Sequence, residues 1–204
     1  MSMRDAAVDA FLSLIAEKGF SSVTLRDVAV RAGVGLGDLY RLYPDKAALI
    51  ASFIARIDTA VLAAVTCEND GEETARDRLF DVMMQRYEAL RAERPAWREL
   101  RRALLRDPLL ALAVAPAIRR SMAAMLEGAG IASDGLAGAL RQNALALLHF
   151  EVARTFDRDE TGDLSKTMVA LDGRLKMAER WAQMFENKRF SRQERSVEAV
   201  PPAA

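Results

Sequence analysis

Apolar side chains recur at helical spacing along nearly the whole chain, and this periodicity limits the fold more than any other feature of the sequence. Residues 8, 11, 12 and 15 already follow the i, i+3, i+4, i+7 pattern of one helix face. Similar spacing returns in segment after segment up to Phe185, and no stretch alternates between apolar and polar residues as a strand does. The sequence therefore predicts an all-α protein.

Glycine, proline and capping residues divide this pattern into about nine helices, three short and six longer. Gly19 ends the first helix, because glycine adopts the left-handed C-cap conformation at little cost. Thr24 and Asp27 form a near capping box for the second helix, and Asp45 caps the fourth. Pro95 and the later Pro108 are expected in the first turns of two further helices.

These breaks predict a small helical unit on a larger helical bundle. The polar segment at 67–73 contains a glycine and is the expected hinge between the two parts of the molecule. The chain after residue 187 is charged and then ends in a Pro-Pro pair, so we expect it to be poorly ordered. The predicted domains are residues 1–47, residues 48–187 and a tail of residues 188–204.

The composition bears on the partners and the compartment of the protein. Lys plus Arg equals Asp plus Glu, at 29 each, so the net charge of the whole chain favours no particular partner. Cys67 is the single cysteine, which excludes an internal disulfide and fits a reducing compartment. No uncharged run approaches the roughly 18–20 residues of a membrane span, and the start lacks the features of a signal peptide. We therefore expect a cytoplasmic protein without a membrane span.

Residues 24–46 have the pattern of two short helices joined by a glycine-bearing turn. A helix-turn-helix needs a small residue in its first helix, a glycine in the turn and apolar anchors that fix the crossing angle. Ala29, Gly33, Val34 and Leu39 are suited to those positions. From these residues alone, an ordinary pair of packed helices is an equal alternative.

The longer segment around this pair resembles the N-terminal domain of the tetracycline-repressor (TetR) family. The family pattern recurs in order over about the first 50 residues, at Gly19-Phe20, Thr24, Val28-Ala29, Ala32-Gly33-Val34, Leu39-Tyr40, Tyr43 and Lys46. The resemblance implies a ligand-responsive transcriptional regulator, with repression as its expected role, that binds double-stranded DNA as a homodimer. The DNA contacts that it implies are Thr24, Arg26, Leu36, Gly37, Asp38, Tyr40, Arg41 and Lys46.

The start of the expected recognition helix departs from the family pattern. Gly35 stands where the family usually has a capping Ser or Thr. Asp38 places a carboxylate where the family prefers a neutral donor; phosphate would repel it, although it could accept a hydrogen bond from cytosine. Leu36 and Leu42 also replace polar residues. Residues 1–57 contain seven basic and six acidic residues. This excess of positive charge is weak for a domain whose affinity for DNA comes from neutralising phosphates.

The resemblance assigns the remaining helices to ligand binding and dimerisation. Methionine and aromatic residues there suit an apolar or amphipathic small molecule, although such residues at helical spacing are also common in cores. The candidate pocket residues are Met83, Met84, Tyr87, Trp97, Met122, Met125 and Phe150. The resemblance implies that the last two long helices form a four-helix bundle with those of a second copy. A stripe on the final helix is the expected dimer interface, with packing inside one chain as the alternative. Its members are Leu164, Met168, Leu171, Leu175, Ala178, Trp181 and Phe185.

A second, looser similarity covers residues 155–181. This segment resembles the C-terminal part of lipid-binding accessory proteins of ubiquinone biosynthesis, which share the TetR-like fold but do not act as repressors. It raises the alternative of a lipid- or isoprenoid-binding accessory protein with degenerate DNA binding. Packing of an acidic loop and an amphipathic helix explains the same residues.

No enzyme, metal site or cofactor is expected. His149 and Cys67 are far apart in the sequence, whereas metal sites cluster such residues. His149 lies in an apolar run and is expected to be a hydrogen-bonded core residue. The acidic segment 157–163 lacks the closing Glu of a calcium-binding loop and is expected to be a solvated loop.

Overall fold

The computed structural model describes residues 2–65 and 73–198, and over these residues the regular structure is helical. The predicted all-α fold is confirmed for this part of the chain. The predicted hinge at 67–73 falls, apart from residue 73, outside the described residues. The elements are α1 (Met3–Lys18), η1 (Phe20–Ser22), α2 (Leu25–Ala32), α3 (Leu36–Leu42), α4 (Lys46–Ala64), α5 (Ala75–Arg91), α6 (Arg94–Arg106), α7 (Pro108–Gly128), α8 (Gly135–Phe156) and α9 (Ser165–Glu198).

Local capping explains where several helices begin. The Thr24 hydroxyl accepts a hydrogen bond from the Asp27 N–H at 3.2 Å, and the Asp27 carboxylate accepts one from the Thr24 N–H at 2.9 Å. Asp45 caps α4 by accepting from the Ala48 N–H at 2.8 Å. Pro95 and Pro108 lie in first turns, where helix geometry requires no N–H donor. The predicted starts are therefore confirmed, and only the η1 turn has no counterpart among the predicted elements.

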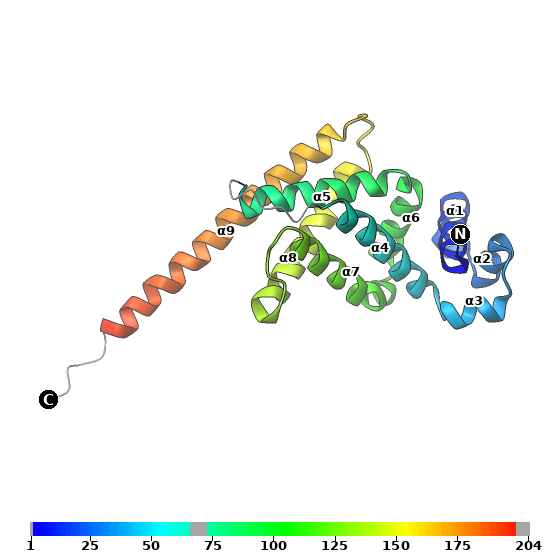
Figure 1. The fold of residues 1–204 in the computed structure, drawn as a ribbon, viewed down its shortest axis with the longest axis horizontal. Coiled ribbons are helices and arrows are strands. Elements are labelled where there is room, and N and C mark those ends of the chain that lie inside the picture. The colour runs from blue at the N-terminus through cyan, green and yellow to red at the C-terminus, as the bar shows by residue number, and fades with distance from the viewer. Residues whose placement is uncertain (1, 66–72, 199–204) are drawn as a thin grey trace.

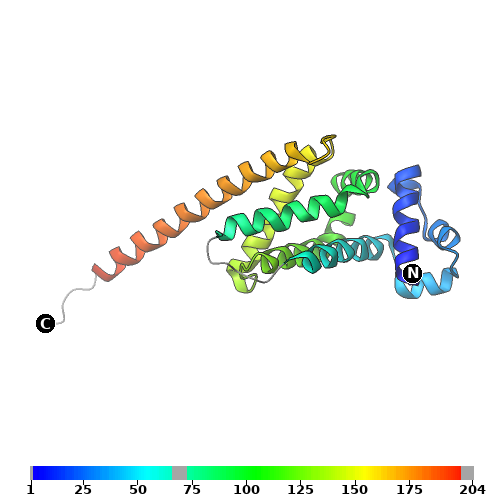
Figure 2. The same ribbon diagram turned by 45° about the horizontal axis from the view of Figure 1, so that its top comes forward.

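The helices are arranged as a small unit of α1, α2 and α3 joined to a larger bundle (Figure 1). α4 leads from the small unit into the bundle and packs along α7 through an inner face that includes Phe53, Ile57 and Val61. α1 also contacts α6, and Figure 2 shows it lying across the end of the bundle. The small unit therefore meets the bundle through both α4 and α6.

Arg56 of α4 adds an electrostatic link between the two parts. Its guanidinium pairs with Asp9 of α1, and its Nη2 lies 3.9 Å from Oε1 of Glu93, the residue before α6. All three side chains are partly exposed to solvent, so the pairs contribute little to stability. They connect the three helices at which the small unit meets the bundle.

α8 is less buried than its sequence predicts. The segment 143–150 is apolar almost all round, yet Leu147 is 70 % exposed. Leu136 and Leu140 on the same helix are exposed as well. One side of α8 packs on α7 and α9, and these leucines lie on the other side, which no described helix covers.

The acidic segment 157–163 is only in part the solvated loop that the sequence predicts, because Glu160 and Asp163 are exposed but the other acids are not. Asp157 and Asp159 are both buried, and Asp157 pairs with Arg101 of α6. Asp159 accepts hydrogen bonds from the N–H and the hydroxyl of Thr167, both at 2.7 Å, and so closes the start of α9. Burial raises the pKa of the Asp159 carboxyl, but hydrogen bonds from Thr161 and Thr167 outweigh it and lower the pKa to about 2. These carboxylates hold the connection between α8 and α9.

α9 continues to Glu198, past the predicted domain boundary at residue 187. The helix can continue because no glycine or proline occurs between residues 174 and 198. Figure 1 shows its C-terminal part projecting away from the bundle. The predicted boundary therefore does not coincide with the end of a helix.

α4 and α7 are long and apolar enough to cross a membrane, judged by length and composition alone. They pack against each other in the bundle and supply core residues from their inner faces. This is the behaviour expected of central helices in a folded domain.

Candidate nucleic-acid interface and ligand cavity

The turn between α2 and α3 has a defined backbone geometry. Gly33 has a φ of 67°, in the left-handed region that favours glycine. The Val34 N–H donates to the Ala29 carbonyl at 3.0 Å and the Gly33 N–H to the Val30 carbonyl at 3.2 Å, which together form a Schellman motif. Ala29 and Leu39 are buried between the helices. The turn and the anchors of the predicted helix-turn-helix are therefore present.

α3 directs polar and apolar side chains outward from this scaffold. Leu36 and Tyr40 are 47 % and 59 % exposed, while Leu39 between them is fully buried. Gly37 is exposed, with open space where a side chain would project. Thr24 and Arg26 are exposed at the start of α2. The structure thus brings these predicted contacts to the outside of the helix pair, where a nucleic-acid backbone can approach.

Asp38 and Arg41, both predicted DNA contacts, form an ion pair with each other across one turn of α3. The acidic charge on the recognition helix is therefore compensated within the helix. The same ion pair occupies Arg41, which is the one basic side chain of α3. The sequence contains both residues at i, i+3 spacing, so this pairing could have been predicted from the helix pattern.

Gly35 and Asp38 are close in space as well. Gly35 is the N-cap of α3 and provides no side-chain cap. A Cβ atom on Gly35 would lie 2.9 Å from Oδ2 of Asp38, so the carboxylate folds back over the start of the helix. A negative charge is favourable there, beside the unpaired N–H groups of the first turn. The two departures at residues 35 and 38 therefore belong to one local arrangement.

Lys46 is held by the small unit rather than extended into solvent. Its Nζ donates to the Phe20 carbonyl at 3.0 Å and lies 4.1 Å from the centre of the Phe20 ring. Partial burial lowers the pKa of the Lys46 ammonium. Because an ammonium has three N–H donors, Lys46 can still donate to a phosphate.

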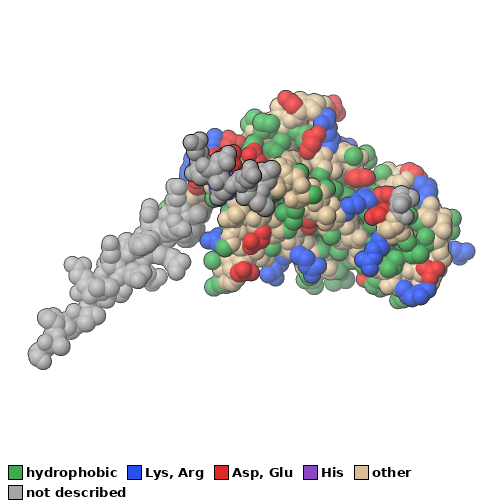
Figure 3. All heavy atoms as spheres, in the orientation of Figure 1, with side chains coloured by type: hydrophobic (Ala, Val, Ile, Leu, Met, Phe, Trp, Pro, Cys, Tyr) green, Lys and Arg blue, Asp and Glu red, His purple; other side chains and the backbone are tan. Residues whose placement is uncertain are grey.

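A network between α1 and α2 was not among the predicted features. Arg31 donates to both carboxylate oxygens of Glu17, at 2.8 and 2.9 Å, and to the Ser13 hydroxyl at 3.0 Å. The hydrogen bonds from Arg31 and Ser13 lower the pKa of Glu17 to about 2. Two basic side chains of the small unit, Arg31 and Arg41, are therefore paired with acids inside it. Figure 3 agrees, since acidic and basic side chains are interspersed over the visible face of this unit.

Comparison with known proteins identifies the helix-turn-helix. Residues 7–53 match the model of bacterial regulatory proteins of the tetR family. The N-terminal domain belongs to the TetR family. The HTH-type transcriptional repressor KstR is 43 % identical over 53 residues in Rhodococcus jostii and 40 % identical over 53 residues in Mycolicibacterium smegmatis. Each match spans about a quarter of this chain and of the relative, 26 % and 25 % in the first case and 26 % of both in the second.

Solved structures extend the likeness from the N-terminal unit to the fold of most of the chain. A TetR transcriptional regulator from Nitrosomonas europaea superimposes with a TM-score of 0.67 at 25 % identity, over 86 % of this chain and 97 % of that one. A TetR transcriptional regulator from Rhodococcus sp. RHA1 gives a TM-score of 0.61 at 22 % identity, over 85 % and 96 %. The C-terminal bundle therefore has the architecture of TetR-family regulators.

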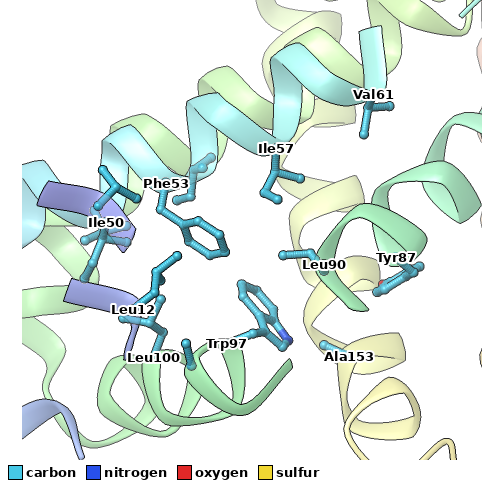
Figure 4. Packing of buried hydrophobic residues seen from close by; sticks show 14 of the residues in the cluster. Leu12, Ile50, Phe53, Ile57, Val61, Tyr87, Leu90, Trp97, Leu100 and Ala153 are labelled. Carbon is cyan, nitrogen blue, oxygen red and sulfur yellow. The ribbon is translucent and has the colours of Figure 1, made fainter. Parts of the chain in front are cut away.

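The bundle of this TetR-like chain contains a cavity of about 20 Å³ between α4, α5, α6, α7 and α8. Most of its wall is apolar, and Figure 4 shows Phe53 of α4 and Trp97 of α6 pointing toward each other in this part of the core. Half-buried Leu104, Ile118 and Phe150 complete the wall. A volume of this size has room for one water-sized group.

Four helices bring charged and polar groups together at or beside this wall. Arg86 of α5 is buried and pairs with Asp58 of α4, which also accepts a hydrogen bond from the Ser121 hydroxyl of α7 at 2.7 Å. His149 of α8 lines the same cavity and has its Nδ1 2.9 Å from the Tyr87 hydroxyl. Burial holds the pKa of His149 well below its usual range, so the ring is neutral at pH 7.

The predicted pocket residues are divided between this wall and the core. Trp97, Met122 and Phe150 line the cavity. Met83, Met125 and Tyr87 are fully buried and do not line it, and Met84 is half-buried. Sequence reasoning missed Arg86, although it lies on the buried stripe of α5 that includes Leu79, Met83 and Leu90. A lone arginine on an apolar stripe is the signal that could have found it.

The predicted dimer stripe on α9 is also divided. Leu164, Leu171 and Leu175 are buried within the chain, which is the intramolecular alternative. Met168 and Ala178 are exposed, and the side chains of Trp181 and Phe185 lie outside the described residues. Other exposed apolar side chains occur on α8 and α9. An ion pair between Arg174 of α9 and Glu151 of α8, at 3.0 Å, joins the exposed sides of the two helices. These exposed apolar residues are Leu136, Leu140 and Leu147 of α8 and Val169 and Met177 of α9.

Proposed function

We propose that the protein is a ligand-responsive transcriptional repressor of the TetR family that binds a palindromic DNA site as a homodimer. The observation that carries the proposal is the exposed α3 on a helix-turn-helix whose sequence, residues 7–53, matches the family. In a dimer each α3 would enter the major groove of one half-site. Thr24, Tyr40 and Lys46 would contact phosphates, and Arg26, Leu36, Gly37, Asp38 and Arg41 would lie near the groove.

The outer face of α8 and α9 is the proposed dimer surface. The exposed leucines of α8 and the exposed Val169, Met168 and Met177 of α9 supply an apolar area that a second copy can cover. Two such helix pairs would form a four-helix bundle. This revises the expected interface from the buried stripe of α9 to its outer side.

The cavity is the proposed ligand site, and two helices can carry its signal. Phe53 of α4 and Trp97 of α6 both line it, and both helices also contact the small unit, α4 through α1 and α6 through α1 and η1. A ligand that prefers one separation of these helices would shift the spacing of the two α3 helices in the dimer. We expect the protein to act in the cytoplasm and to catalyse no reaction. Within residues 2–65 and 73–198 no cluster of three or more His, Cys, Asp or Glu residues could hold a metal ion.

A gel-shift assay with the DNA upstream of its own gene tests the proposal. We expect a sequence-selective, salt-sensitive shift that Tyr40→Ala weakens at least about tenfold, since phosphate contacts position the domain on DNA. Tyr40→Phe removes only the hydroxyl, so it distinguishes the contribution of the hydroxyl to DNA binding from that of the ring. Lys166→Ala, an exposed lysine on α9, is the matched control for Lys46→Ala. The absence of any shift would overturn the proposal, and so would a shift that neither Tyr40→Ala nor Lys46→Ala changes.

The alternative of a lipid-binding accessory protein is favoured by one observation, the pairing of Arg41 with Asp38, which leaves α3 without a free basic side chain. Native mass spectrometry of the freshly purified protein tests it. A co-purifying isoprenoid or lipid together with no DNA shift would support this alternative over the repressor.

A further inference from the structure

Three residues that line the cavity each carry a buried polar atom without a hydrogen-bond partner among the described residues. These atoms are Arg86 Nε, Trp97 Nε1 and His149 Nε2. All three residues are more than nine-tenths buried. Buried polar groups in native proteins are nearly always hydrogen-bonded, so three such groups around one cavity indicate an occupant that supplies their partners.

The chemistry of these atoms restricts the occupant. Arg86 Nε and Trp97 Nε1 carry N–H groups that can only donate. His149 can adapt, because the Tyr87 hydroxyl lies 2.9 Å from its Nδ1 and 3.3 Å from its carbonyl oxygen. If the hydroxyl donates to Nδ1, Nε2 carries the ring proton and donates; if it donates to the carbonyl, Nε2 accepts. At least two N–H donors, those of Arg86 and Trp97, therefore need an acceptor on the occupant.

The charges around the cavity exclude an ionised group on that occupant. The guanidinium of Arg86 is already compensated by Asp58, and His149 is neutral. A carboxylate placed here would be a buried charge without a counter-ion, which is strongly unfavourable. Apart from Ser121, whose hydroxyl donates to Asp58, the rest of the wall is apolar, with Ile50, Phe53, Ile54, Leu100 and Met122.

We propose that the cavity binds an uncharged, mostly apolar molecule through one acceptor oxygen of the carbonyl class, with Arg86 and Trp97 as the donors. This names the ligand chemistry of the regulator proposed above and rests on that function. The cavity of about 20 Å³ accepts the oxygen, and the remainder of the molecule parts the half-buried side chains of Leu104, Ile118 and Phe150. Those three side chains come from α6, α7 and α8, so entry of the ligand displaces α6, which contacts the small unit.

Three probes of similar size test the proposal on the full chain: cyclopentanone, methylenecyclopentane, which replaces the oxygen by CH₂, and cyclopentanecarboxylate. The readout is the indole ¹⁵N–¹H signal of Trp97, assigned by its loss in Trp97→Phe. We expect cyclopentanone to bind about tenfold more tightly than methylenecyclopentane and to move the Trp97 signal downfield. We expect the carboxylate to bind no better than the hydrocarbon.

Trp97→Phe removes the donor and keeps an aromatic ring, so it should abolish most of the preference for the ketone over the hydrocarbon. Phe150→Leu is the matched control, because it also shortens a wall residue but leaves both donors. Tighter binding of the carboxylate, equal binding of ketone and hydrocarbon, or a Trp97 signal that no probe shifts would each overturn the proposal. The gel-shift is run in parallel: ketone binding without a DNA shift contradicts the regulator alone, and a DNA shift without ketone binding contradicts the ligand chemistry alone.

Discussion

The chain contains an Asp–Arg ion pair on the surface of α3 and another in the interior between α4 and α5. The side chains of Asp38 and Arg41 are 46 % and 78 % exposed, whereas those of Asp58 and Arg86 are 13 % and 3 % exposed. A surface pair is worth at most about 1 kcal/mol. Breaking a buried pair leaves an unpaired charge and costs about 3–5 kcal/mol. The same two residue types therefore set the surface charge in one place and hold three helices together in the other.

The largest expected effect is that of Arg86→Met. The substitution leaves the Asp58 carboxylate buried without its cation, so we expect the free energy of unfolding to fall by about 3–5 kcal/mol. Urea denaturation followed by circular dichroism measures it. Arg91→Met, on the exposed side of the same helix, is the control and should change stability by less than about 1 kcal/mol.

Replacing both partners of the inner pair should recover most of that loss. Asp58→Leu combined with Arg86→Met substitutes apolar side chains for both charges, which is often neutral or stabilising. We expect the double variant to unfold within about 1–2 kcal/mol of the wild type. A double variant as unstable as the sum of the two single variants would show that the two residues act independently.

The surface pair should respond in the opposite way, with little change in stability and a clear change in DNA binding. Asp38→Asn removes a charge that phosphate repels and releases Arg41, so we expect tighter DNA binding and a steeper salt dependence, by about one released counterion per half-site. Fluorescence anisotropy across a salt series measures both. Glu160→Gln, an exposed acid far from α3 in the sequence, controls for net charge. Unchanged affinity in Asp38→Asn would mean that α3 does not approach phosphate.

The smallest expected effect concerns the other surface network, Glu17 with Arg31. Because the pKa of Glu17 is lowered to about 2 in the folded protein, its stabilising contribution is complete above its ordinary pKa of 4.5 and is lost as the pH falls toward 2. Glu17→Gln should therefore flatten the fall in melting temperature between pH 5 and pH 2, and only slightly, since the pair is exposed. Glu88→Gln on α5 is the control. An identical acid profile in both variants would contradict the assigned pKa.

The ends of the helices could be read from the sequence because they depend on neighbours in the chain. The Thr24–Asp27 capping box, the left-handed Gly33 and the Asp45 cap each involve residues within about four positions of each other. The Asp38–Arg41 pair is equally local and was nevertheless missed, because each residue was judged for its contact with DNA rather than with its neighbour in the helix.

The cavity could not be read in the same way. Arg86, Ser121 and His149 line it from three helices, and Asp58 of a fourth helix pairs with Arg86. Their proximity depends on which helix faces meet. A methionine or aromatic pattern does not distinguish a cavity wall from a core, which is why Met83 and Met125 proved to be core residues. The buried acids at 157 and 159 were missed for the same reason, because α6 and α9 supply their partners.

The sequence by itself determined the helical class, the capped starts of several helices and the helix-turn-helix, since hydrophobic periodicity and capping act over one or two turns. Only the tertiary structure decided which leucines of α8 and α9 are covered, how the charge of Arg86 on α5 is compensated, and where buried donors lack partners. Those features are set by packing between segments far apart in the sequence, where one helix rotated by a single position would present different atoms.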